Sequence, residues 1–419
     1  VPPQANLQNP NPKIPFRELG IRLPTSLEPL SQKDRDVYCG VNSFGFGGTN
    51  AHVVLQRAEK PPLEEKKDGS AGEQILTLSG RDPKVLTALA RSYAQMLSRG
   101  KRAALEDICH SARIRRSAHE CRLSVVAASA AEMATELEQF AAHGYSDHVI
   151  QGKALRRAES RPVFVFTGMG PQWWGMGRQL LENEPVFRKA AEEIDAIFRP
   201  LAGFSILEEM REDKSRSRIK ETRIAQPANF VVQVALAELL RSWGVYPAAV
   251  VGHSVGEVSA AYVSGALSLE DAVAVSYHRS RLQQLAAGKG RMLATGLNRE
   301  QAERILESCP ETVSIAAINS VSTVTLAGDG EALASIAEQL AKDEIFNRFL
   351  DVEVAYHSPQ MEELKPELRK SLHGLRPQTP HTPLYSTVTG RRVEGPDLDA
   401  EYWCSNMRKP VLFADAMVA

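Results

Sequence analysis

A strand that turns sharply into a helix around one serine is the feature that most constrains how this chain can fold. Residues 248–251 are continuously apolar and predict a buried strand, and residues 257–262 predict a helix. Between them stands Gly252-His253-Ser254-Val255-Gly256, a Gly-x-Ser-x-Gly turn that pushes the serine hydroxyl out of the sheet in front of a helix N-terminus. Ser254 is therefore a candidate nucleophile. The alternative is that these glycines only permit tight packing of the helix on the strand.

Length and composition limit the number of domains and the classes of partner that this chain can have. A chain of 419 residues that is 43% hydrophobic predicts two or three domains, and a net charge of -1 gives no general attraction to nucleic acid or to an anionic membrane. The five cysteines show no C-x-x-C spacing, so neither a metal site nor a disulfide framework is expected. No signal peptide and no apolar run of roughly 20 residues is present, which favours a cytoplasmic protein.

Residues 1–57 end on a glycine-rich run, Cys39-Gly40-Val41-Asn42-Ser43-Phe44-Gly45-Phe46-Gly47-Gly48-Thr49-Asn50-Ala51-His52-Val53-Val54-Leu55. This run resembles the C-terminal end of a β-ketoacyl synthase domain in type I polyketide and fatty acid synthases. The resemblance places that domain's nucleophilic cysteine and catalytic histidines upstream, so we expect no condensing activity here. Asn50 and His52 are then expected to be structural.

Residues 58–72 have the polar, Pro- and Gly-containing composition of a linker. A small α/β unit follows, with predicted strands at 75–78 and 123–128 and predicted helices at 82–98, 104–116 and 130–142. It resembles the adaptor between ketosynthase and acyltransferase in the same megasynthases. It is also locally basic, which indicates either a solvated charged face or a landing surface for an acidic carrier protein. The basic residues are Arg99, Lys101, Arg102, Arg113, Arg115, Arg116 and Arg122.

A second glycine-rich loop, residues 167–177, follows a predicted strand at 163–166. It lacks the Gly-Lys-Ser/Thr ending of a nucleotide-binding loop. Beside the Ser254 turn, it resembles the oxyanion loop of malonyl-CoA:acyl carrier protein acyltransferases, with Gln172 at the family's conserved glutamine. Many relatives carry glutamine where this chain has Met169, and the Gly-Met-Gly form is similar to animal-type fatty acid synthases and iterative polyketide synthases.

A helix predicted from Ser268 to about residue 285 carries Arg279. Ser268 can cap its start, and Asp271 can reach back to the cap. An arginine on a mostly apolar helix often covers apolar surface with its stem and leaves its charge in solvent. The resemblance implies another role, because Arg279 stands where acyltransferases keep the arginine that binds the free carboxylate of malonyl groups, a task suited to a bidentate guanidinium.

Residues 291–352 predict elements in the order β-α-β-β-α-β, the ferredoxin-like arrangement, with strands at 292–295, 313–318, 324–327 and 347–350 and helices at 299–308 and 330–342. The resemblance implies an α/β fold in which this ferredoxin-like small subdomain is inserted into an α/β hydrolase-like large one, with the active site in the cleft between them. The predicted domains are a ketosynthase tail (1–57), a linker domain (58–160), the large subdomain (161–290), the small subdomain (291–352) and the rest of the large subdomain (353–419), apparently truncated.

A serine hydroxyl needs a base, and histidine has a suitable pKa near 6.5. Ten histidines compete for this role. Tyr356-His357-Ser358-Pro359 matches the catalytic-histidine segment of the acyltransferase family, so His357 is the predicted base. No carboxylate is an obvious partner for its ring, and in the family backbone carbonyls orient this histidine.

The resemblance implies a ping-pong acyltransferase. Ser254, deprotonated by His357, attacks an acyl-CoA thioester, and the backbone amides of Val255 and Gln172 stabilise the oxyanion. The acyl group then passes to the phosphopantetheine thiol of an acyl carrier protein. The implied partners are this carrier protein, the coenzyme A thioester and the rest of the megasynthase including its ketosynthase, with no bound cofactor.

Two alternatives remain open: a serine esterase or thioesterase, and a non-catalytic fragment that docks carrier protein. Arg279 argues against a hydrolase of neutral esters, and the combined Ser254, His357 and Arg279 set argues against the fragment. Val354, Tyr356 and Val255 are the predicted determinants of extender selectivity. A tyrosine at 356 is expected to fill the space of an α-methyl branch, so malonyl is favoured and methylmalonyl is possible.

Overall fold

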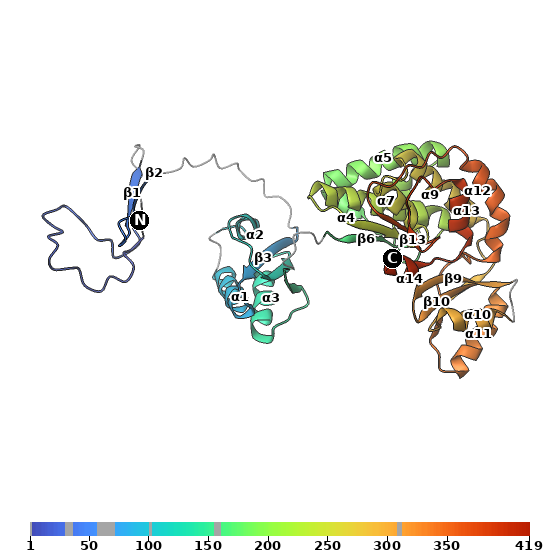
Figure 1. Ribbon diagram of the computed structural model, residues 1–419, viewed down its shortest axis with the longest axis horizontal. Coiled ribbons are helices and arrows are strands. Elements are labelled where there is room, and N and C mark those ends of the chain that lie inside the picture. The colour runs from blue at the N-terminus through green and yellow to red at the C-terminus, as the bar shows by residue number, and fades with distance from the viewer. Residues whose placement is uncertain (1, 30–36, 57–71, 100–102, 155–160, 308–311) are drawn as a thin grey trace. The chain divides into compact units, whose positions relative to one another are not determined.

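A computed structural model describes residues 2–29, 37–56, 72–99, 103–154, 161–307 and 312–419 (Figure 1). The chain divides into two compact units, residues 1–154 and 155–419. Each unit is considered by itself. Within the described ranges, no helix combines the length and the apolar character needed to span a bilayer.

The first unit begins with an antiparallel hairpin of β1 (Tyr38–Phe44) and β2 (Asn50–Gln56), and every residue of both strands is exposed. Val41, Phe44 and Val53 are among these exposed apolar residues, so the hairpin forms no core of its own. His52 Nδ1 lies 2.6 Å from Asn42 Oδ1 across the hairpin, and both side chains are exposed.

A three-stranded antiparallel sheet, in the order β3-β4-β5, forms the rest of this unit. Alternate residues of β3 and β4, such as Leu76 and Val125, are buried against the helices, as the period of two in a half-exposed sheet requires. The elements are β3 (Gln74–Gly80), α1 (Pro83–Ser98), α2 (Leu105–Ile114), β4 (Cys121–Ala127), α3 (Ala130–His143) and β5 (Val149–Lys153). The last strand was not predicted, because it is short and almost wholly exposed.

The second unit contains a sheet in the order β13-β12-β7-β6, whose strands β6, β7 and β12 are parallel. Helices cover it, and α5, α7 and α9 pack on one another (Figure 1). The strands are β6 (Val163–Phe166), β7 (Ala249–Gly252), β12 (Leu384–Ser386) and β13 (Arg391–Arg392). The helices are α4 (Arg178–Asn183), α5 (Pro185–Ala202), α6 (Ile206–Arg211), α7 (Thr222–Ser242), α8 (Gly256–Val263), α9 (Leu269–Gln284), the 3-10 helix η1 (Pro359–Leu364), α12 (Lys365–Ser371), α13 (Ala400–Arg408) and α14 (Phe413–Val418).

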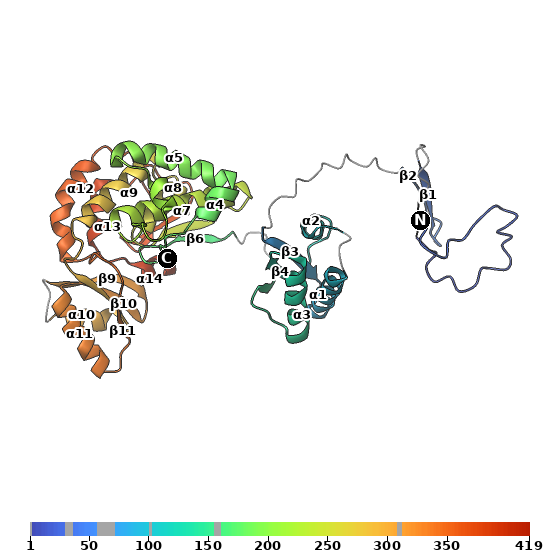
Figure 2. The ribbon, with the colours of Figure 1, turned by 180° about the vertical axis from the view of Figure 1, so that it is seen from behind.

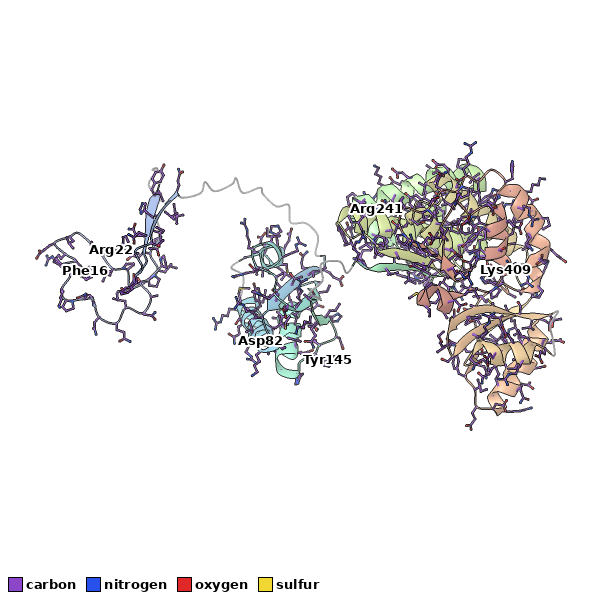
Figure 3. The ribbon with its side chains drawn as sticks, viewed as in Figure 1. Phe16, Arg22, Asp82, Tyr145, Arg241 and Lys409 are labelled. Atoms are coloured by element: carbon purple, nitrogen blue, oxygen red, sulfur yellow. The ribbon has the colours of Figure 1, made fainter. Side chains whose placement is uncertain are left out.

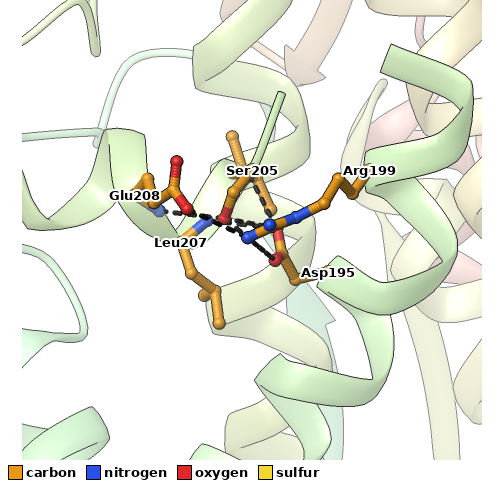
Figure 4. A network of polar contacts seen from close by, with 6 residues as sticks. Asp195, Arg199, Ser205, Leu207 and Glu208 are labelled. Carbon is orange, nitrogen blue, oxygen red and sulfur yellow. Dashed lines mark hydrogen bonds and ion pairs between the residues drawn. The ribbon is translucent and has the colours of Figure 1, made fainter. Parts of the chain in front are cut away.

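A buried carboxylate fixes the start of α6 against α5. Asp195 Oδ1 accepts hydrogen bonds from Ser205 Oγ at 2.9 Å and from the main-chain N–H of Ile206 at 2.7 Å. Arg199, one turn further along α5, pairs with Asp195 from the solvent side (Figure 4). Because the N–H groups of a first helical turn have no intrahelical partner, this side chain supplies the acceptors that α6 would otherwise lack.

The small lobe of the second unit interrupts the large one between α9 and η1. Its elements are β8 (Arg291–Thr295), α10 (Arg299–Leu306), β9 (Val313–Ser320), β10 (Thr323–Gly328), α11 (Gly330–Lys342) and β11 (Asn347–Phe349), the order predicted from the sequence. All neighbouring strands are antiparallel, in the order β11-β8-β10-β9. Figure 2 shows α10 and α11 on this lobe, well away from α5 and α7. The chain returns to the large lobe and touches β9 again through a bridge between Ala317 and Val411.

Candidate active site

The predicted turn around Ser254 is present. β7 ends at Gly252 and α8 begins at Gly256, and Ser254 has a φ of 54°, a left-handed conformation that non-glycine residues rarely adopt. A Cβ at Gly252 would overlap the backbone of Glu257, and one at Gly256 would overlap the carbonyl of Phe166. Both glycines are therefore required by close backbone approach, and the serine between them is lifted from the end of the strand.

His357 lies beside this serine. Its Nε2 is 2.7 Å from Ser254 Oγ, and its Nδ1 is 2.8 Å from the main-chain oxygen of Lys409. A carbonyl oxygen only accepts, so Nδ1 carries the proton and Nε2 is left to accept from the serine hydroxyl. Lys409, labelled in Figure 3, follows α13. A main-chain carbonyl thus orients this ring, as the resemblance implied.

The environment keeps the His357 ring neutral. Burial, together with the nearby positive charge of Arg279, lowers its pKa to about 3. Its side chain is 3% exposed, so little solvent is available to stabilise an imidazolium. At neutral pH the ring is ready to accept a proton from Ser254.

We expect this lowered pKa to be visible in a pH profile. The reaction of Ser254 with a fluorophosphonate needs neutral His357, so its rate should stay high below pH ~6.5, the ordinary histidine value, and fall only toward the lowered pKa. The free energy of unfolding should also depend on the protonation of His357. Between the two pKa values the unfolded chain binds a proton that the folded chain does not, so this contribution to stability is lost as the pH falls from ~6.5. An acidic limb centred near 6.5 would contradict the buried geometry.

Arg279 is fully buried on α9, and its guanidinium faces the same serine. Nη2 donates to Ser254 Oγ at 3.0 Å, and Nη1 donates to Gln226 Oε1 at 2.7 Å and to Gln283 Oε1 at 2.9 Å. Nε donates to Asn406 Oδ1 at 3.1 Å. All of these acceptors are neutral. Across the described residues, Arg279 forms no ion pair, and its burial lowers its pKa to about 10. A buried cation without an anionic partner is costly, and a bound carboxylate would offset that cost.

A cavity of about 260 Å³ opens at Ser254 between the two lobes of the second unit. Tyr356 forms part of its wall, and its hydroxyl is 2.7 Å from Thr222 Oγ1, which fixes the ring. Burial raises the pKa of this tyrosine to about 12, so the hydroxyl is protonated. The wall is mainly apolar and consists of Met169, His253, Ser254, Met292, Ala294, Ala316, Ala317, Asn319, Thr325, Leu350, Val352, Tyr356 and His357.

Four predicted site residues do not line this cavity, and the fully buried Arg279 is one of them. Val255 is 3% exposed, and Val354 is fully buried in the hydrophobic core. Gln172 also lies outside the wall, and its side-chain Oε1 accepts from the N–H of Gly170 at 2.8 Å. Met169, from the same loop, does line the cavity. Over the described residues, the N–H groups of Met169, Val255 and Gln172 all lack a main-chain acceptor, so only the place of Met169 in the cavity wall favours it over Gln172 as the second amide donor.

Asn406, Gln226 and Glu257 belong to the site but were not predicted to. Asn406 and Gln226 bind Arg279 directly, and Asn406 also donates from Nδ2 to Glu257 Oε2 at 2.9 Å. Glu257 follows the Ser254 turn in sequence, which was a usable signal, because a carboxylate in the buried first turn of such a helix needs partners. Asn406 gave no signal of its own.

Four of the seven predicted basic residues lie around a separate cavity of about 710 Å³ in the first unit. Arg113, Arg115, Arg116 and Arg122 line it, together with His119. Arg99 follows α1, and Lys101 and Arg102 lie outside the described residues. Over the described ranges, no group of three or more metal-binding side chains is found.

A serine on a strand-to-helix turn, paired with a histidine, defines a class of α/β enzymes that can form acyl-serine intermediates. The sequence model of the acyl transferase domain matches residues 163–419, and that of the ketoacyl-synthetase C-terminal extension matches residues 10–126. The chain belongs to the acyl transferase domain family, here the acyltransferase of a type I polyketide synthase preceded by the ketosynthase extension.

Known proteins that are similar to this chain support the same family assignment. The chain is 36% identical over 437 residues to the hybrid PKS-NRPS synthetase pyvA of Aspergillus violaceofuscus, covering 100% of this chain and 11% of that protein. It is 35% identical over 419 residues to erythronolide synthase EryA2 of Saccharopolyspora erythraea, covering 100% of this chain and 12% of that protein. The acyltransferase domain from module 8 of the salinomycin polyketide synthase superposes with a TM-score of 0.78 at 34% identity, over 83% of this chain and 82% of that one. The chain thus spans about a tenth of the length of these two synthases.

Proposed function

We propose that this acyltransferase loads a malonyl-type extender unit from coenzyme A onto Ser254 and passes it to the phosphopantetheine thiol of an acyl carrier protein. The observation that carries the proposal is the position of Ser254 Oγ, which lies 2.7 Å from a neutral histidine nitrogen and 3.0 Å from a buried guanidinium. The first group supplies a base and the second supplies a site for the free carboxylate of the acyl group.

The first half-reaction begins when Ser254 Oγ attacks the thioester carbonyl and its proton moves to His357 Nε2. The N–H groups of Val255 and Met169 then stabilise the oxyanion. The carbon–sulfur bond then breaks, and the departing CoA sulfur takes the proton from Nε2. The product is an acyl ester on Ser254.

The second half-reaction runs the same steps in reverse with a new thiol. The carrier's phosphopantetheine thiol gives its proton to His357 Nε2 and attacks the ester carbonyl. The carbon–oxygen bond breaks, and Ser254 Oγ recovers the proton. Neither half-reaction needs a bound cofactor.

A serine esterase or thioesterase would share Ser254 and His357 but would let water finish the reaction. Intact-mass spectrometry after brief exposure to malonyl-CoA, methylmalonyl-CoA and acetyl-CoA, followed by carrier protein, tests the proposal. A stable malonyl adduct that leaves only when carrier is added supports it. Rapid loss to water supports a hydrolase, and no adduct supports a fragment that only docks carrier.

We infer that malonyl is preferred to methylmalonyl. Tyr356 is 4% exposed in the cavity wall, and its hydrogen bond to Thr222 keeps the ring from swinging aside. Val354 and Val255, the other two residues expected to set extender selectivity, do not line the cavity, so the exclusion of an α-methyl rests mainly on this ring.

Replacing Tyr356 by serine should shift the preference toward the branched unit. Discrimination over one methyl is worth about 1–3 kcal/mol, so the malonyl-to-methylmalonyl ratio should fall by roughly tenfold or more. Competition between equimolar malonyl-CoA and methylmalonyl-CoA, read by intact mass, measures the ratio. Tyr356→Phe is the control, because it removes the hydroxyl but keeps the ring. A wild-type protein that takes up mainly methylmalonyl would overturn the inference.

For the carrier protein we infer a docking surface at the basic cavity of the first unit. Four arginines line it, and an acidic partner would be steered to such a surface. A surface of this kind affects the second half-reaction and leaves loading from CoA unchanged.

For the fold, we infer the finer class from the order of the elements: an α/β hydrolase-like large subdomain with a ferredoxin-like small one inserted between α9 and η1. The boundaries 1–57, 58–160, 161–290, 291–352 and 353–419 remain our proposal for the domains.

A further inference from the structure

Glu257 is a fully buried carboxyl group that the two half-reactions do not use. It lies on the first turn of α8, three residues after Ser254. Its Oε1 accepts from the N–H of Thr387 at 3.1 Å and from the Tyr402 hydroxyl. Its Oε2 is 3.0 Å from Thr387 Oγ1 and accepts from Asn406 Nδ2 at 2.9 Å. A buried carboxyl with this many partners is held in one position.

Asn406 connects this carboxyl to the guanidinium. Its Oδ1 accepts from Arg279 Nε at 3.1 Å, and its Nδ2 donates to Glu257 Oε2 and, at 3.3 Å, to the carbonyl oxygen of Ser254. An arginine side chain has only donors, so the amide oxygen must face Arg279 and the amide nitrogen must face Glu257. The orientation of the Asn406 amide is therefore fixed by both neighbours.

We propose that Asn406, held by Glu257, is a positioning residue that aims Arg279 at the carboxylate of the acyl group. It fixes the Nε side of the guanidinium, so that Nη2 stays directed at Ser254 Oγ. The proposal rests on the proposed function of Arg279.

The arrangement has a physical advantage over a direct ion pair. A carboxylate in contact with Arg279 would compete with the carboxylate of the substrate for the same donors. With a neutral amide between them, Glu257 does not touch the guanidinium and leaves its Nη2 side available. The amide also ties the guanidinium to the Ser254 main chain, which couples the two groups that must meet the substrate.

Glutamine cannot replace Glu257 in this network. An amide NH2 at the position of Oε1 would face the N–H of Thr387, and at the position of Oε2 it would face the NH2 of Asn406. Either orientation sets one donor against another. Glu257→Gln should therefore turn or release the Asn406 amide even though the side-chain volume is unchanged.

The test compares wild type with Asn406→Ala, Glu257→Gln, Arg279→Ala and the double variant Arg279→Ala/Asn406→Ala. For each, kcat/KM is measured for loading by malonyl-CoA and by acetyl-CoA, together with the rate of fluorophosphonate labelling of Ser254. We expect Asn406→Ala and Glu257→Gln to lower malonyl loading at least tenfold and to lower acetyl loading and labelling by a clearly smaller factor. The double variant should load malonyl no worse than Arg279→Ala alone, because Asn406 acts through the arginine. Asn298→Ala, which removes the N-cap of α10 in the small lobe, is the matched control for loss of a structural asparagine.

Two results would overturn the proposal while the proposed function stands. One is an equal loss of malonyl loading, acetyl loading and labelling in both Asn406→Ala and Glu257→Gln, which would show a structural role. The other is an additive loss in the double variant. If Arg279→Ala itself fails to separate malonyl from acetyl loading, the function proposed for Arg279 is wrong and the inference falls with it. Thermal unfolding identifies a variant that has not folded, and the second variant then decides.

Discussion

Replacing Ser254 by alanine is expected to abolish the uptake of acyl groups from acyl-CoA. In this structure the hydroxyl lies on a strained turn and is 2.7 Å from the unprotonated nitrogen of His357. Alanine removes the atom that forms the acyl bond, and losses of a nucleophile in serine enzymes are on the order of a thousandfold or more. Intact-mass spectrometry with labelled malonyl-CoA measures the effect, and peptide mapping locates the adduct in the wild-type chain.

Ser259→Ala is the matched control. This serine lies on α8, which follows the Ser254 turn; it is buried and donates to Gln233 Oε1 at 2.7 Å, away from the cavity. It should load acyl groups at close to the wild-type rate. An adduct that persists in Ser254→Ala, or that maps to another residue in the wild type, would show that the nucleophile lies elsewhere.

Much of this fold could be predicted because the relevant signals are local. The strand at 163–166 and the helix at 330–342 were placed at their observed ends, from a short apolar run and a 3.6-residue period. The apolar run also predicted a buried strand, which was wrong, because β6 is an edge strand on which Val163 and Val165 are exposed. The turn at Ser254 was predictable from a local signal. Its two glycines stand at positions where any side chain would overlap the backbone, so the five consecutive residues of the turn are enough to predict it.

The partners of Arg279 and His357 could not be predicted in this way. Asn406 is 127 positions from Arg279 in sequence, and Lys409 is 52 positions from His357. Moreover, the group that orients His357 is a main-chain carbonyl, which every residue possesses. Only the packing of α13 against the turn brings these groups together, and no local pattern encodes that packing.

Local rules also failed where tertiary contacts competed. Ser268 caps α9 as predicted, but Asp271 does not reach back to the cap, because its Oδ2 accepts from the N–H of Arg376. The long helix α7 was not predicted from its start at Thr222, and Pro227 lies within its second turn. A proline at this position has no N–H to donate to the carbonyl oxygen four residues earlier, so it interrupts the helical signal in the sequence, although the largely buried helix continues through it.

Replacing Arg279 by alanine should remove the preference for dicarboxylic acyl groups and spare the reactivity of the serine. The guanidinium is fully buried, and its described partners are all neutral, so a malonyl carboxylate would be its only counter-charge in contact. Without it, that carboxylate would be buried unpaired, which costs several kcal/mol, and malonyl loading should fall by roughly a hundredfold or more. Acetyl loading needs no cation and should survive or improve.

The matched control is Arg281→Ala, two residues further along α9, where the side chain instead contacts His278 and Ser371. Arg281→Ala should change the loading rate of neither malonyl-CoA nor acetyl-CoA. The ratio of malonyl to acetyl loading, measured as kcat/KM for each, decides between a binding and a structural role for Arg279, because equal losses for both substrates would show that it serves the fold.

Arg279→Ala also removes one of the charges that lower the pKa of His357. The acidic limb of fluorophosphonate labelling should therefore move to higher pH in Arg279→Ala and stay in place in Arg281→Ala, a shift that loss of substrate contact alone would not produce.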